Sequence, residues 1–118
     1  MSIILHITKR AKWEKALKAG QYEADSLHDQ GFIHCSKSEQ VISVANFKFH
    51  GRKDVVLVCI DADKVASEIR YENCKGGNEL FPHIYGPLNL DAVTDVYEFQ
   101  PLPDGSFVLP DNLADNTT

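Results

Sequence analysis

The chain has 118 residues, of which 43% are hydrophobic and 25% charged, and its formal net charge is -5. This length and composition are typical of one globular domain with one core. The acidic balance argues against non-specific nucleic-acid binding. No apolar run approaches the roughly 20 residues of a membrane span, so no membrane contact is expected. Residues 1–5 are too short for a secretory signal, which predicts a cytoplasmic location.

The first strand is predicted over residues 3–7, which are almost continuously apolar and therefore expected at the centre of a sheet. Thr8 is expected to cap the helix that follows. Trp13 and Leu17 recur in it at helical spacing, and Gly20 supplies its end. Residues 21–30 are expected to be an extended segment and a polar connection.

The stretch Gly31–Ser36 is predicted to be a short strand in which His34 and Ser36 share one face. Ser36, Lys37, Ser38 and Glu39 then match the capping box of a second helix, over about residues 38–49. A strand that runs straight into a helix leaves free N–H groups at the junction, which favours anion binding there. The alternative is that Ser36 is only an N-cap.

The second half of the chain is predicted to be mainly strands and loops. A buried interior strand is expected at 55–60, a half-buried strand at 68–72, a long loop at 73–89, a strand near 93–100 and an edge strand at 106–109. Two early helices followed by strands without regular alternation predict an α+β fold with a small mixed or antiparallel split sheet. We expect one domain over residues 1–110, a disordered tail over 111–118 and a monomer.

Three histidines interrupt apolar or aromatic surroundings: His6, His34 and His83. Burial disfavours a charged imidazole, so such residues are usually neutral and paired. We expect them to surround one pocket together with Ser36, Tyr85 and Glu72. The alternative is that each is an unrelated core residue satisfied by its own hydrogen bonds.

Other chemistries fit the pattern less well. No H-E-x-x-H or similarly tight spacing is present, so no metal site is expected. Cys35 should face away from His34, which argues against a Cys–His pair, and Ser36 lacks a G-x-S-x-G elbow. The odd number of cysteines without a C-x-x-C pair is typical of free thiols. Tyr85 and Phe81 could stack on a flat ring or simply seal a loop.

Several segments together resemble the bacterial and plant family called domain of unknown function 952. They are residues 5–8, Trp13, Gly20, Gly31–Ser36 and the segment F-P-H-I-Y-G-P at 81–87. The resemblance covers about residues 3–100, and the family has no settled activity.

That family is in turn similar to the ADP-ribosyltransferase-like fold, which implies binding of NAD or a related nucleotide. The similarity implies that His6 and Ser36 hold the nicotinamide end of NAD. From the placement of polar residues in apolar strands, we further predict ligand contacts by Thr8 and Tyr85 and catalytic roles for His34, His83 and Ser36. The superfamily's catalytic glutamate has no clear counterpart, because neither Glu72 nor Glu98 lies in a recognisable motif. A phosphotransferase-like branch works without that glutamate.

Three hypotheses follow for the function. The first is a transferase-like or glycohydrolase-like enzyme acting on the bound nucleotide, with histidines as acid, base or phosphate ligands. The second is a module that binds a nucleotide or another small molecule without chemistry. In the third, each histidine is purely structural.

Overall fold

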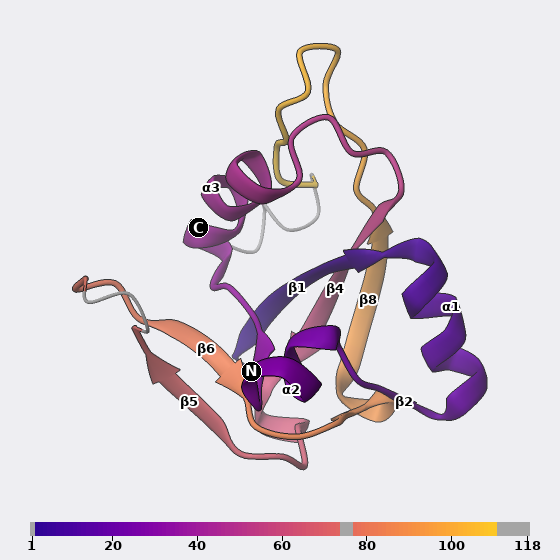
Figure 1. The fold of residues 1–118 in the computed structure, drawn as a ribbon, viewed down its shortest axis with the longest axis vertical. Helices are drawn as coiled ribbons and strands as arrows, with labels where there is room; N and C mark the ends of the chain where they lie inside the picture. Colours follow the sequence, from indigo (N-terminus) through magenta and orange to yellow (C-terminus); the bar gives the residue numbers. More distant parts are fainter. Residues whose placement is uncertain (1, 74–76, 111–118) are drawn as a thin grey trace.

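A three-stranded antiparallel sheet forms the centre of the molecule (Figure 1). Its strands are β1 (Ile3–Lys9), β4 (Val55–Asp61) and β8 (Val93–Glu98), in the order β1-β4-β8. All residues of β4 are buried, which confirms the predicted interior strand. β1 lies at the sheet edge, and the prediction of a central position was wrong. The computed structural model describes residues 2–73 and 77–110; Cys74 and the tail predicted for 111–118 lie outside them.

Two smaller antiparallel sheets complete the split arrangement. One has the order β3-β6-β5 and the other pairs β2 with β7. Their bounds are β2 (Gln21–Tyr22), β3 (Ile33–His34), β5 (Ile69–Glu72), β6 (Phe81–Ile84) and β7 (Leu88–Asn89). In Figure 1, β5 and β6 form an arm that extends away from the central sheet. The antiparallel, split α+β fold is therefore as predicted.

Three α-helices are present in the described residues, where two were predicted. They are α1 (Arg10–Ala19), α2 (Asp25–Gln30) and α3 (Ser38–Lys48), and the single turns η1 (Ala62–Lys64) and η2 (Leu90–Ala92) add 3-10 helix. α1 ends at Gly20, whose φ of 89° suits glycine. α2 replaces the expected extended segment and buries none of its residues, so it has no apolar stripe to reveal it.

Four local predictions were wrong. The N-cap of α1 is Lys9 rather than Thr8, and that of α3 is Lys37 rather than Ser36. In α3 the Lys37 N–H donates to the Gln40 side chain at 3.0 Å, so Gln40 takes the place expected for glutamate. Residues 81–84 form β6 instead of part of a loop. Residues 106–109 form no strand, and their Phe107 packs against Phe99.

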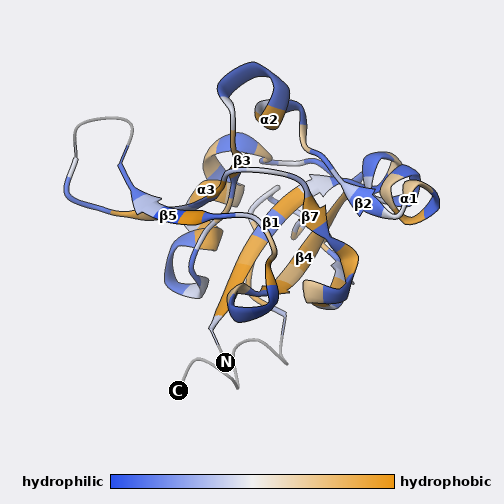
Figure 2. Cartoon of the chain, turned by 90° about the horizontal axis from the view of Figure 1, so that it is seen from below, coloured by the Kyte–Doolittle hydropathy of each residue, from blue (hydrophilic) through white to orange (hydrophobic). Residues whose placement is uncertain are grey.

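The central sheet has an apolar core on each face. Val56, Val58 and Ile60 of β4 pack on one side with Trp13 and other residues of α1, β2 and β6. The alternate residues of β4 pack on the other side with α3 and the Phe99–Phe107 pair. In Figure 2, apolar colour runs along β1 and β4, and polar colour covers much of the outer helices. No helix in the described ranges is long and apolar enough to cross a bilayer.

Leu57→Ala in β4 tests this core. Leu57 is fully buried, so its truncation should lower the free energy of unfolding by about 2–5 kcal/mol in urea titrations. Val96→Ala on the exposed side of β8 should change it by less than about 0.5 kcal/mol. Equal effects of the two variants would contradict the arrangement of the sheet.

Candidate functional site

Two backbone hydrogen bonds join the edge of β1 to the chain that leaves β3. The Leu5 N–H donates to the Ser36 carbonyl, and the Ser36 N–H donates to the Leu5 carbonyl, both at 2.8 Å. Successive residues of an antiparallel strand present their N–H and C=O groups to opposite sides. Because those of Leu5 face Ser36, those of Ile7 also point away from β4. The edge of β1 is therefore hydrogen-bonded to Ser36 at Leu5, and at Ile7 its backbone N–H and C=O groups reach a cleft.

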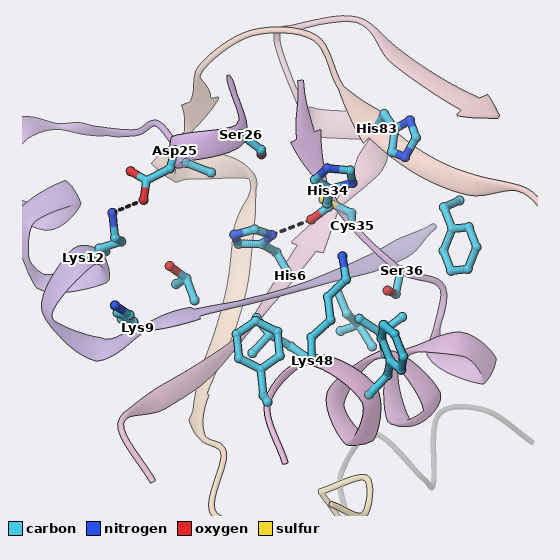
Figure 3. A pocket seen from close by; sticks show the side chains of 18 of the residues that line it. His6, Lys9, Lys12, Asp25, Ser26, His34, Cys35, Ser36, Lys48 and His83 are labelled. Carbon is cyan, nitrogen blue, oxygen red and sulfur yellow. Dashed lines mark hydrogen bonds and ion pairs between the residues drawn. The ribbon is translucent and has the colours of Figure 1, made fainter. Parts of the chain in front are cut away.

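A cleft of about 520 Å³ runs along this edge. β1 forms its floor, the start of α1 and of α2 form one side, and the C-terminal half of α3 forms the other (Figure 3). The segment 34–36 closes one end, together with Phe81 and His83 of β6. His6, Thr8, His34, Ser36 and His83, five of the six predicted site residues, line this one cleft.

The His34 and His83 side chains meet because of strand pairing. The two residues are directly opposite in β3 and β6. The next pair along carries a hydrogen bond from the Cys35 N–H to the Pro82 carbonyl, at 3.0 Å. This makes His34 and His83 a non-hydrogen-bonded pair, whose side chains approach most closely. Their rings are 5.3 Å apart and nearly perpendicular, and Phe32 stacks on His83 at 4.2 Å.

His6 is held by the protein on both ring nitrogens. Its Nδ1 lies 2.5 Å from the His34 carbonyl oxygen, and its Nε2 lies 2.7 Å from the Tyr22 hydroxyl. Burial lowers the pKa of His6 to about 4, so the ring is neutral near pH 7. The predicted polar ligand contact through His6 nitrogens thus competes with internal bonds, while the ring itself lines the cleft.

The carbonyl of His34 fixes the direction of this network. A carbonyl only accepts, so neutral His6 carries its proton on Nδ1 and accepts at Nε2 from the Tyr22 hydroxyl. The hydroxyls of Tyr22 and Thr8 are 2.9 Å apart, and Thr8 then donates to Tyr22. Burial raises the pKa of Tyr22 to about 12, which keeps this hydroxyl protonated. The network orders the floor of the cleft.

Glu72 holds the His83 ring through a hydrogen bond. The His83 Nδ1 is 2.9 Å from Glu72 Oε1, and the Tyr85 hydroxyl donates a short hydrogen bond to the same oxygen. These bonds, first that of Tyr85 and then that of His83, lower the pKa of Glu72 below its usual value. Tyr85 lies outside the lining of the cleft, and the Arg70 guanidinium sits 4.4 Å from its ring centre. Glu98 does not line the cleft and forms an ion pair with Arg10.

The charges of the cleft come from residues that the sequence interpretation did not select as a site. Lys9, Lys12 and Lys48 line it, against one carboxylate, Asp25. Lys12 pairs with Asp25 at 2.6 Å, and Figure 3 shows Lys48 extended across the cleft towards Ser36. Of residues 36–39, the junction that was predicted to bind anions, only Ser36 lines the cleft, and α3 itself lines it with residues 43–48.

Lys48 and Tyr22 had little signal in the sequence. An exposed lysine in the last turn of a helix usually marks only a solvated end, and Tyr22 lies in a two-residue strand. Lys9 and Lys12 belong to a basic run at 9–18, and such a run usually marks only a solvated helix face.

The sequence analysis also weighed a Cys35 nucleophile and a metal site, and argued against both. Burial raises the pKa of the Cys35 thiol far above its usual value, which argues against a thiolate nucleophile there. Within residues 2–73 and 77–110, no three His, Cys, Asp or Glu side chains are grouped to hold a metal ion.

Comparisons with known proteins agree with the fold. The sequence model of a family described as "Protein of unknown function (DUF952)" matches residues 7–96. A crystal structure of protein CC0527 from Caulobacter crescentus is 33% identical and superposes with a TM-score of 0.86, covering 96% of this chain and 99% of that chain. A solution NMR structure of CC0527 is 34% identical, with a TM-score of 0.82, covering 97% and 98%. No curated protein matches this sequence.

The burial of His6 predicts acid sensitivity. Its pKa is about 4 in the folded protein and 6.5 for an ordinary solvated histidine, so the unfolded chain binds the proton first as the pH falls. Stability should therefore decrease from about pH 6.5 to pH 4. In urea titrations, the wild type should lose about 2–3 kcal/mol more than His6→Asn between pH 7 and pH 4.5.

The exposed His28 provides the control for this measurement. His28→Asn should keep the wild-type pH dependence. An identical pH dependence in His6→Asn and the wild type would contradict the assignment of a neutral, buried His6.

Proposed function

Because the chain belongs to the DUF952 family of unknown function, its role must be read from its own cleft, and we propose that this cleft binds NAD or a related nucleotide. The observation that carries the proposal is the charge of the lining. Three lysines and one aspartate surround a cleft in a protein with a net charge of -5. Such a local excess of cations favours an anionic ligand, and phosphate groups are well suited to lysine ammonium groups.

The size and the floor of the cleft support a ligand of this class. Its volume of about 520 Å³ is in the range of small-molecule sites. Most of the surface that lines it is apolar, and the uncharged polar groups include His6, Thr8, His34, Ser36 and His83. The outward-facing N–H and C=O of Ile7 offer one donor and one acceptor side by side. A planar carboxamide such as that of nicotinamide presents the complementary pair.

The resemblance to the ADP-ribosyltransferase-like fold supports the same ligand. It implies NAD contacts at His6 and Ser36, and the sequence analysis added Thr8; all three are among the lining residues. The sequence analysis also gave a stacking role to Tyr85, whose ring lies outside that lining. We therefore retain the first three as ligand contacts and reassign the stacking role below. A cytoplasmic, monomeric protein remains our expectation.

Titration of the protein with NAD and with ADP-ribose tests the proposal. Amide NMR signals of Ile7, Ser36 and His83 should shift at millimolar ligand or below. Lys48→Glu should weaken binding by about tenfold or more, because it replaces a phosphate-binding cation with a repelling charge. Lys15→Glu makes the same charge change on the exposed side of α1 and should have a much smaller effect.

The absence of shifts around the cleft would reject nucleotide binding. Equal weakening by Lys15→Glu and Lys48→Glu would show that net charge, rather than the cleft, governs the interaction.

The Glu72–His83 pair favours a second candidate function, hydrolysis of the bound nucleotide. A carboxylate that holds one imidazole nitrogen orients the ring and makes it a better base. Water would add to the ribose carbon of NAD as the bond to nicotinamide breaks, giving ADP-ribose, nicotinamide and a proton. His83 would accept that proton. The competing view is that Glu72 only satisfies a buried histidine, and the protein then binds without chemistry.

Release of nicotinamide from NAD, measured by chromatography after long incubation, separates these two functions. If His83 is the base, Glu72→Gln should slow release by about tenfold or more while binding persists, because the orienting charge is lost. Glu68→Gln, one residue before the strand that carries Glu72, is the matched control, since Glu68 pairs with Arg70 instead. No release by the wild type would leave the binding module as the function.

A further inference from the structure

α3 has two distinct faces. Val41 and Ala45 are fully buried against the central sheet. Ser43, Val44, Phe47 and Lys48 line the cleft instead, and their spacing of one, four and five residues places them on one side of a helix. Phe47 therefore belongs to the cleft face and contributes nothing to the core.

Phe47 is also the most exposed large apolar side chain among the described residues. It is 81% exposed, whereas its neighbour Phe49 is half-buried and packs against the core. An aromatic side chain left in water next to Lys48, at the mouth of a cationic cleft, offers an open π-face close to a phosphate-binding charge. Nucleotide-binding surfaces combine these two groups, because a base stacks on the ring while a phosphate meets the cation.

Two further phenylalanines line the cleft, Phe49 and Phe81, and both are half-buried, unlike Phe47. The remaining aromatic rings nearby are already covered. Phe32 stacks on His83, and Tyr85 carries the Arg70 guanidinium over its ring. Tyr22 is buried between His6 and Trp13. The stacking role that the sequence analysis gave to Tyr85 is thus better suited to Phe47.

We propose that Phe47 is the stacking platform for the base of the bound nucleotide, whose phosphates lie at the lysines. This inference rests on the proposed function and narrows it. The cleft should select nucleotides over sugar phosphates that carry the same anionic group, and the base should lie at the α3 side of the mouth.

A matched pair of ligands tests this selectivity. AMP and ribose 5-phosphate share the sugar and the phosphate, and only AMP carries a base. NMR titration of the full chain should give an affinity for AMP about 5- to 150-fold higher than for ribose 5-phosphate, the range expected for stacking one base. Phe47→Ala should reduce this ratio towards one while the affinity for ribose 5-phosphate stays unchanged.

Two control variants complete the experiment. Phe47→Trp should keep the preference for AMP, because it keeps an aromatic face. Leu17→Ala removes another exposed apolar side chain, 56% exposed on α1 and outside the cleft, and should also keep it.

Three outcomes would overturn the platform. The first is an unchanged ratio of the two affinities in Phe47→Ala, and the second is an equal loss of affinity for both ligands. The third is a change in sedimentation alone, which would make Phe47 a contact between copies of the chain. If wild type binds NAD but Phe47→Ala keeps the ratio, only this inference fails. If wild type binds none of NAD, AMP and ribose 5-phosphate, the proposed function fails with it.

Discussion

The pair of hydrogen bonds between Leu5 and Ser36 is the constraint on which the site depends. It holds the segment after β3 against the edge of the central sheet, although that segment begins in another sheet. The same contact brings the His34 carbonyl to His6 and forms the end wall of the cleft. A shift of one residue in this register would turn Ser36 and His34 away from β1, so the geometry leaves little room for alternatives.

The buried and the exposed polar groups of the cleft have different tasks. His6, Tyr22 and Thr8 satisfy one another in a directed chain that needs no ligand and keeps His6 neutral. They determine the shape of the floor. The lysines at the mouth are solvated and can exchange water for phosphate at small cost. A protein that is acidic as a whole can in this way attract an anion to one place on its surface.

Much of the fold could be predicted because it follows local patterns. β4 is a continuous apolar run, α1 ends at a glycine, and α3 has a helical stripe. β1 looked central because an apolar strand was taken to have neighbours on both sides. β1 is an edge strand, and it is buried by the packing on both faces of the sheet. β6 was hidden by its proline, and α2 by its lack of buried residues. Such features depend on tertiary packing, which periodicity does not encode.

The residues of the site also fall into those that the sequence could reveal and those that it could not. The three histidines could be selected because a polar residue in an apolar strand needs a partner, and the structure brings all three to one cleft. Phe47 and Lys48 carry no such signal, since an exposed side chain on a helix normally has no special role. Their meaning comes only from the side of α3 on which they lie.

Pro82 has a consequence for how the chain passes between the two sheets. Opposite Cys35, an ordinary residue would return a second hydrogen bond to β3, but proline has no N–H to give. The β3–β6 ladder is thereby weakened one residue before Ser36, and Ser36 takes Leu5 as its partner. The missing donor at Pro82 thus favours a change of pairing partner from β6 to β1. A proline in one sheet in this way helps to direct the chain along the edge of another.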